Sequence, residues 1–289
     1  MIKQITREKL EVEKYTACLH RAVNYRIYAE SWYLDTVTNQ QWDCLVLNDY
    51  EAIMPIPYRK KMGIKYIAQP LYCQQLGIFH SETFNQQQFD AFYARLRSKL
   101  VKNYQMNEEN LIFLSPAIST KINQVLDLSL DYTKFRSGLR KNRKQELQKG
   151  LPQDHQIISS MTDQFFIDLL SKEYKSIQDQ LYLKQLQPLV DIIQSKALGI
   201  TISILKENEV VASSFYLKSG QRLIQLCNSK KQNSSINYNT FIVDYMIRNY
   251  LNQSKILDFE GSSIKGVNEF NASFRASTVQ IPIFKTKFL

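Results

Sequence analysis

One order of structural elements occurs twice in this sequence, and that repetition restricts the fold more than any other feature. The first copy comprises a predicted strand meander at residues 42–68, an irregular stretch at 69–77, a helix at 84–104, and short strands at 111–114 and 123–128. The helix is predicted because Phe89, Phe92 and Leu96 recur at intervals of three or four residues. Asn48 and Asp49 predict the first turn, since both tolerate left-handed backbone angles.

The second copy shares this pattern and very few of the residues. Its predicted elements are strands at 200–205, 210–217 and 223–227, an irregular stretch at 228–235, a helix at 236–251, a strand at 256–259, a weak helix at 264–274 and a last strand at 278–284. Helices are predicted between the copies at 134–149, 162–175 and 184–197. Duplication of one supersecondary unit predicts an α+β chain of two similar domains, residues 1–130 and 131–289, each with a mixed, mostly antiparallel sheet and flanking helices.

The composition argues against several other classes of protein. The four cysteines contain no C-x-x-C pair and only three histidines are present, so no zinc site or other metal site is expected. No run approaches 18 apolar residues, so no membrane-spanning helix is expected. The first residues lack the apolar core of a signal peptide. Together these features predict a cytoplasmic protein.

The chain is strongly basic. Its 37 Lys and Arg residues outnumber 27 Asp and Glu residues, which gives a formal net charge of +10. A positive field of this size attracts nucleic acid, phosphate-bearing ligands or acidic lipid surfaces, and the charge alone does not choose among them.

The basic charge is densest at residues 134–149, where seven residues are basic and one is acidic. On a continuous helix, Arg136, Arg140 and Arg143 share one face. Because neighbouring like charges destabilise a helix, the pattern predicts an anion or substrate site on that face. The alternative is a basic helix edge that only faces water.

Four stretches carry a resemblance to a known family. The stretch FRSGLRKNRKQELQKG resembles the basic helix that opens the second domain of the Fem-type aminoacyl transferases. This group is peptidoglycan aminoacyl transferase-like and belongs to the GNAT acyltransferase superfamily. The segment ILDFEGSSIKGVNEFNASF resembles the closing segment of that domain. The stretches SWYLD and QPLYCQQLGIF are similar to bacterial members of the group. The resemblance implies two tandem GNAT-like domains with a substrate groove.

In such a fold the strands at 223–227 and 256–259 diverge, and the helix from residue 236 begins at the mouth of the gap. A helix N-terminus offers unpaired N–H groups to phosphate. The resemblance therefore places the pyrophosphate of acyl-CoA or CoA at Lys230, Lys231, Gln232, Asn233, Ser234 and Ser235. This stretch lacks the glycine-rich turn that is usual for CoA-dependent members, so an inert surface loop is the alternative.

Two residues are candidates for acid–base work. Glu260, at the end of its strand, could accept a proton from an attacking amine, and Tyr238 could donate one to a leaving group. The structural alternative is that Asp258 pairs with a nearby Arg or Lys and Ser262 caps the next helix. In the first half, Gln74 and Gln75 occupy the equivalent loop and Trp32 could line a groove, although aromatic residues are more often part of the core.

The predicted function is transfer of an acyl group from acyl-CoA to an amine acceptor. The first alternative is a Fem-type transferase that uses aminoacyl-tRNA, which the charge suits, although the long coiled-coil insertion that many Fem-type enzymes carry is missing from this sequence. The second is a non-catalytic relic of the fold that binds nucleic acid or another anion.

Overall fold

The computed structural model describes residues 1–160, 164–173, 177–231, 234–251, 253, 255–261 and 264–286. The chain forms two compact units, unit 1 with Met1–Ile122 and Gln280–Leu289, and unit 2 with Asn123–Val279. The expected division after residue 130 thus falls after residue 122, and the C-terminal residues return to unit 1. The reason is that β7 (Thr120–Asp127) enters unit 2, where its residues Val125 to Asp127 pair antiparallel with β12 (Ile256–Asp258).

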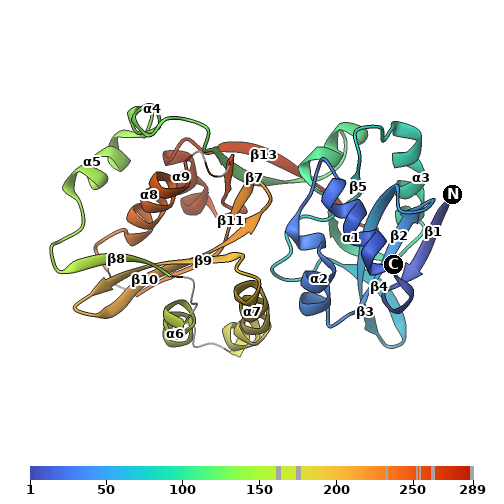
Figure 1. Ribbon diagram of the computed structural model, residues 1–289, viewed down its shortest axis with the longest axis horizontal. Coiled ribbons are helices and arrows are strands. Elements are labelled where there is room, and N and C mark those ends of the chain that lie inside the picture. Colours follow the sequence, from blue (N-terminus) through green and yellow to red (C-terminus); the bar gives the residue numbers. More distant parts are fainter. Residues whose placement is uncertain are drawn as a thin grey trace. The chain divides into compact units, whose positions relative to one another are not determined.

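The strands of unit 1 form a mostly antiparallel sheet (Figure 1). Its neighbours in order are β1 (Ile2–Thr6), β2 (Trp42–Leu47), β3 (Ala52–Lys61), β4 (Ile64–Ala68), β6 (Val101–Gln105) and β13 (Ser277–Phe284), with β5 (Phe79–His80) beside β3. Only β4 and β6 in this series are parallel. The meander is confirmed, and its first turn holds Asn48 at a φ of 48°, as expected for a residue that tolerates left-handed angles.

Three α-helices accompany this sheet, α1 (Val12–Arg21), α2 (Ser31–Thr38) and α3 (Gln86–Arg97). The predicted helix at 84–104 is correct up to Arg97, but Tyr104 belongs to β6. The strand predicted at 111–114 is wrong, because Glu108–Phe113 is a 3-10 helix. The short buried strand that follows the helix is therefore β6, and the order of elements in the first copy still matches that of the second.

The sheet of unit 2 follows the second predicted copy closely. Its order is β7, β12, β11 (Arg222–Lys230), β10 (Glu209–Ser219), β9 (Gly199–Lys206) and β8 (His155–Ser160). All neighbours are antiparallel except β11 and β12. In the strand order, β13 of the first series is followed by β7 of the second, so the order is one continuous path.

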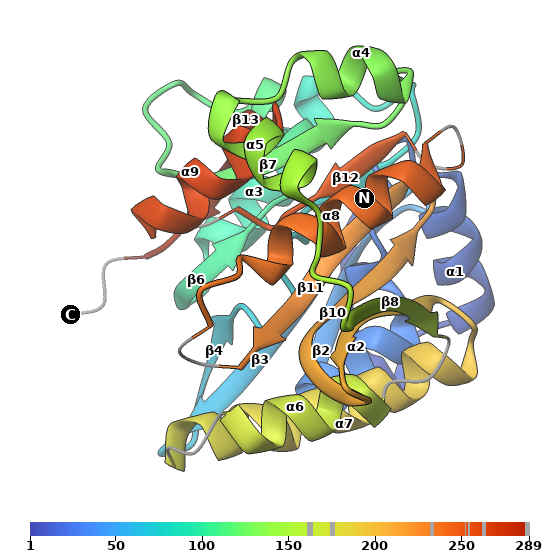
Figure 2. The same cartoon turned by 90° about the vertical axis from the view of Figure 1, so that its left-hand side faces the viewer.

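Helices cover both faces of the unit 2 sheet. Figures 1 and 2 show α8 (Tyr238–Tyr250) and α9 (Lys265–Ser273) on one face, and α6 (Gln164–Glu173) and α7 (Ile177–Ser195) on the other. On β9, Ile200, Ile202 and Ile204 alternate along the strand and are all buried in one cluster with residues of α8. Burying each such side chain contributes about 1.5–3 kcal/mol, so this face holds α8 firmly against the strands.

The predicted basic helix at 134–149 is two helices. α4 (Tyr132–Ser137) ends at Gly138, and α5 (Lys141–Lys149) begins after Arg140, whose ψ of 151° is that of an extended residue. Asp131 caps α4, as expected, by accepting hydrogen bonds from the N–H groups of Thr133 and Lys134. Because the helix breaks between them, Arg136 and Arg143 do not share one helical face.

Among the helices that the structure describes, none is both long enough and apolar enough to cross a lipid bilayer.

Candidate functional site

A cavity opens in unit 2 where two parallel strands diverge. β11 and β12 pair only from Arg222 with Ile256 to Ile224 with Asp258. After β12 the chain turns towards β7, since the N–H of Phe259 donates to the carbonyl oxygen of Gln124. The cavity has a volume of about 320 Å³ and is lined by Gln225, Leu226, Cys227, Asn228, Asn239, Phe259, Glu260, Gly261, Gly266, Val267, Phe270 and Asn271. The divergence implied by the family resemblance is therefore present.

A β-bulge lies on the cavity side of β11. In the pairing of β10 with β11, Tyr216 lies opposite Gln225 and Phe215 lies opposite Cys227, so the register skips Leu226. A bulge bends the strand and redirects backbone groups away from the ladder. Leu226 also lines the cavity, so the bulge lies in the cavity wall.

The carboxylates of Asp258, at the end of β12, and Glu260, two residues later, have different surroundings. Asp258 is fully buried and forms an ion pair with Arg222 at 2.6 Å. Its other oxygen accepts a hydrogen bond from the N–H of Glu260 at 2.8 Å. The structural alternative for Asp258 is therefore confirmed, whereas Glu260 lines the cavity.

Glu260 has an unusual backbone conformation. Its φ is 55°, and that of Gly261 is 56°, so two consecutive residues are left-handed. This region costs a non-glycine residue of order 1–3 kcal/mol, and such residues cluster at functional sites. The bond from its N–H to Asp258 helps to hold Glu260 in this conformation.

Cys227 lies in the cavity close to Glu260. Burial raises the pKa of its thiol, and the negative charge of Glu260 raises it further. The thiol is therefore protonated at neutral pH, which argues against Cys227 as a thiolate nucleophile.

Tyr238 does not line this cavity. Its hydroxyl lies 3.1 Å from Nε2 of His155, whose Nδ1 lies 2.7 Å from Asp154. The next residue, Asn239, does line the cavity, and its Oδ1 is buried without a hydrogen-bond partner. The structure thus does not bring Tyr238 and Glu260 into one cavity.

The predicted phosphate loop lies between β11 and α8. Lys230 and Ser235 are exposed, Lys231 forms an ion pair with Glu209 at 2.6 Å, and Ser234 Oγ accepts a hydrogen bond from the N–H of Ile236. Gln232, Asn233 and also Ser262 lie outside the described residues. The side chain of Asn237, at the N-cap of α8, makes no capping hydrogen bond. This leaves first-turn N–H groups of α8 without that usual side-chain partner.

The three predicted anion-binding arginines lie in three different environments. Arg143 is buried and donates hydrogen bonds to Glu146, Thr240 and Ser273. Its guanidinium also lies over the rings of Phe270 and Phe274, at 4.7 and 5.1 Å from the ring centres. Arg143 therefore ties α5 to α8 and α9, and its assignment to an exposed anion face is corrected. Arg140 is exposed and Arg136 is half-buried.

In unit 1, Gln74 and Gln75 belong to a polar network. Gln75 is fully buried, donates to Gln74 Oε1 at 3.0 Å and accepts from Arg26 Nε at 3.3 Å. Arg26 in turn pairs with Glu109 at 2.8 Å. Trp32 is half-buried against the ring of Tyr33.

The strand end in unit 1 that corresponds to the divergence is closed. Beyond the pairing of β4 with β6, Gln69 Oε1 accepts a hydrogen bond from the N–H of Gln105, and the N–H of Leu76 donates to the carbonyl oxygen of Gln105. The loop between β4 and α3 therefore continues the pairing with β6. Asn85 and Gln88 form a capping box at the start of α3, which occupies N–H groups that phosphate would need.

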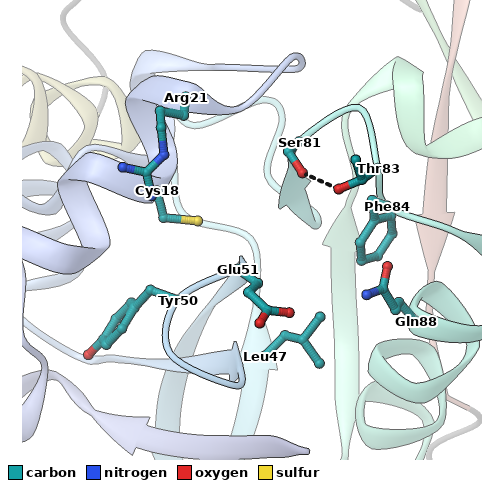
Figure 3. Close-up of a pocket in the computed structure, with 9 residues that line it drawn as sticks. All are labelled: Cys18, Arg21, Leu47, Tyr50, Glu51, Ser81, Thr83, Phe84 and Gln88. Atoms are coloured by element: carbon teal, nitrogen blue, oxygen red, sulfur yellow. Dashed lines mark hydrogen bonds between the residues drawn. The ribbon is translucent and has the colours of Figure 1, made fainter.

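A cavity of about 220 Å³ lies in unit 1 and includes Gln88 of α3 in its lining (Figure 3). Figure 3 shows the carboxylate of Glu51 turned towards its interior, with Ser81 and Thr83 hydrogen-bonded to each other at 3.0 Å across from it. Arg21 and Glu51 both line this cavity, so it holds one charge of each sign and its charge does not mark it as a phosphate site.

Asn239 and Cys227 were not predicted from the sequence. No motif in the sequence marks them, and they become candidates only because the structure places both in the lining of the cavity. No group of three or more His, Cys, Asp or Glu side chains in the described parts of the chain could hold a metal ion.

Comparisons with known proteins identify the fold. No protein-family model matches the chain, and no curated protein matches it in sequence. Solved structures do match over nearly its whole length. FemX is 8% identical to this chain, with a TM-score of 0.67 and 96% of both chains covered. A tandem GNAT protein from the clavulanic acid biosynthesis pathway is 9% identical, with a TM-score of 0.58, and the match covers 98% of this chain and 97% of that protein. L-PGS from Bacillus licheniformis is 12% identical with a TM-score of 0.56 and 95% and 91% covered. The chain therefore has a GNAT-like fold of the tandem, Fem-type form.

Proposed function

We propose that this protein is an N-acyltransferase that moves an acyl group from acyl-CoA to an amine in the cavity of unit 2. The observation that carries the proposal is the divergence of β11 and β12, which opens this cavity with Glu260 in its wall and α8 beginning beside it. The closed strand end of unit 1 supports a single reaction site per chain.

Glu260 is the proposed general base. An amine must lose a proton to form an amide, and a carboxylate within reach of the attacking nitrogen, directly or through one water, can accept it. The fixed backbone of Glu260 favours a defined position for that carboxylate. Tyr238, which is bonded to His155 outside the cavity lining, receives no step in this proposal.

The acyl carbonyl would be polarised by backbone N–H groups at the bulge around Leu226. As the amine attacks, negative charge moves onto the carbonyl oxygen, and the carbon–sulfur bond then breaks to release CoA. The orphaned Oδ1 of Asn239 could accept a hydrogen bond from an N–H of the donor or the acceptor. Most of the catalytic effect would then come from positioning and backbone polarity.

The phosphates of the donor would lie at the start of α8. Lys230 and Ser235 are exposed there, and the N-cap side chain leaves N–H groups available. Lys231 contributes less, since Glu209 already compensates its charge.

A second candidate is a transferase that uses aminoacyl-tRNA as the donor. The likeness to FemX over 96% of both chains and the net charge of +10 favour it. The reaction chemistry in the cavity would be the same, with an ester oxygen in place of the thioester sulfur as the leaving group.

Transfer assays would test the proposal and separate the donors. Acetyl-CoA and aminoacyl-tRNA are each offered with a panel of primary amines, using wild-type protein, Glu260→Gln and the control Glu51→Gln, which removes a carboxylate from the unit 1 cavity. We expect Glu260→Gln to lower kcat by about 10²–10⁴-fold and the control to retain activity. If both variants keep the activity of the wild type, Glu260 is not the general base. Absence of transfer from both donors would favour a non-catalytic binding protein.

A further inference from the structure

A second pocket of unit 2 lies on the corner formed by α4 and α5. It has a volume of about 460 Å³ and is lined by Tyr132, Thr133, Arg136, Ser137, Lys144 and Gln148. None of these residues lines the cavity at the divergence of β11 and β12. The pocket exists because the chain breaks after Ser137, which turns α5 away from the direction of α4.

The two cations in this pocket lack carboxylate partners. Arg136 donates one long hydrogen bond to the hydroxyl of Tyr132 at 3.4 Å, and Lys144 donates to the carbonyl oxygen of Ser137 at 2.6 Å. Within the described part of the chain neither residue forms an ion pair, so both keep most of their hydrogen-bond donors.

The nearby acidic side chains have other partners. Glu146 pairs with buried Arg143, Asp244 pairs with Arg248 at 2.7 Å, and Asp131 caps α4. Among the described residues no carboxylate pairs directly with Arg136 or Lys144, although Asp244 accepts a hydrogen bond from the hydroxyl of Tyr132 in the pocket lining. Exposed Lys134, Arg140 and Lys141 on the same two helices and the turn between them add to the positive charge.

From this arrangement we propose that the α4–α5 pocket binds a phosphate group. A guanidinium provides paired donors that match phosphate oxygens, and an ammonium adds a point charge. The amide of Gln148 can donate further hydrogen bonds, whereas the hydroxyl of Ser137 already donates to the carbonyl oxygen of Lys134. Bound phosphate would also relieve the repulsion between the cations of residues 134–149, which is the feature that predicted an anion site from the sequence.

The phosphate could belong to a small phosphorylated molecule or to a nucleic-acid backbone, and the experiment distinguishes these sources. Binding is measured with inorganic phosphate by calorimetry in a phosphate-free buffer, and with a fluorescein-labelled short single-stranded RNA by anisotropy at several salt concentrations. The variant Arg136→Gln/Lys144→Gln removes both pocket cations. The control Lys60→Gln/Lys61→Gln removes two exposed cations from β3 in unit 1 and lowers the net charge equally.

We expect the pocket variant to weaken binding at least about tenfold and the control variant to bind within about twofold of wild type. For RNA, the slope of log affinity against log salt should fall by about 1 in the pocket variant alone. If the pocket variant loses affinity for RNA, the ligand is a nucleic-acid backbone. If it loses affinity for inorganic phosphate and the wild type does not bind RNA, the ligand is a small phosphorylated molecule. Equal losses in both variants, or no binding of either probe by the wild type, would overturn the proposal. Thermal unfolding of each variant checks that the fold is intact.

Discussion

Replacement of Arg143 by Ala should destabilise unit 2 strongly, although the sequence suggested an exposed ligand-binding residue. The side chain is 3% exposed and bonds to Glu146, Thr240 and Ser273 from three helices. Burial lowers the pKa of its guanidinium, and the attraction of Glu146 opposes that effect. Truncation would leave the carboxylate of Glu146 without its cation, although Thr240 would still donate to Glu146 and Ser273 to the carbonyl oxygen of Phe270.

The expected loss follows from these contacts. Breaking a buried ion pair costs about 3–5 kcal/mol. Because the carboxylate side chain of Glu146 is 37% exposed and can be hydrated, the lower end applies, about 3 kcal/mol. With an m-value of about 2 kcal/mol per molar urea, the midpoint of unfolding would fall by about 1.5 M.

Urea unfolding followed by far-UV circular dichroism measures this loss. Both tryptophans, Trp32 and Trp42, lie in unit 1, so their fluorescence gives a separate signal for that unit. The matched control is Arg140→Ala, which removes an exposed arginine three residues earlier and should cost less than about 0.5 kcal/mol. A loss below 1 kcal/mol for Arg143→Ala, or one equal to that of the control, would refute the structural role of Arg143.

Three further outcomes are expected. Gly77→Ala should destabilise unit 1 by about 2 kcal/mol or more in tryptophan-detected urea unfolding, since Gly77 has a φ of 107° and a Cβ there would lie 2.3 Å from Asn110 Oδ1; a cost below 0.5 kcal/mol would contradict this. Cys227 should react with iodoacetamide at pH 8 more slowly than a free thiol, as measured by peptide mass spectrometry. Glu260→Gln should speed this reaction because it lowers the pKa of the Cys227 thiol, and an unchanged rate would argue against the proximity of Cys227 and Glu260. Burial lowers the pKa of His80, so the contribution of its neutral imidazole to stability is full above pH 6.5 and declines as the pH falls below that value. The unfolding free energy of His80→Gln should lack this part of the pH dependence, and a pH profile identical to that of the wild type would contradict the lowered pKa of His80.

The strands were largely predictable from the sequence, because alternating apolar residues and the polar turns between strands can be recognised within a few neighbouring residues. In unit 2 the predicted strands at 200–205, 210–217 and 223–227 all lie within β9, β10 and β11. The helix at 84–104 was extended too far, since Leu100 and Tyr104 continue its spacing although Tyr104 lies in a buried strand. Spacing alone cannot distinguish these two environments.

The candidate site was less predictable. Glu260 could be named because it ends a strand, but its left-handed backbone has no signal in a non-glycine residue. Arg143 was misassigned because helical spacing assumes an unbroken helix, and the break at residues 138–140 depends on packing against α9, whose Ser273 accepts a hydrogen bond from the N–H of Arg140. Asn239 became a candidate only when the structure placed its buried oxygen in the cavity.

Isothermal titration with CoA is the most direct test of the claim that the unit 2 cavity and the start of α8 hold the acyl donor. One CoA should bind per chain, and Ser234→Asp should weaken binding at least about tenfold, because a carboxylate beside the start of α8 repels the pyrophosphate. The control Ser81→Asp makes the same change in the unit 1 cavity and should leave the affinity within about twofold of wild type. No heat with CoA, two sites per chain, or an affinity unchanged by Ser234→Asp would contradict a donor site in unit 2.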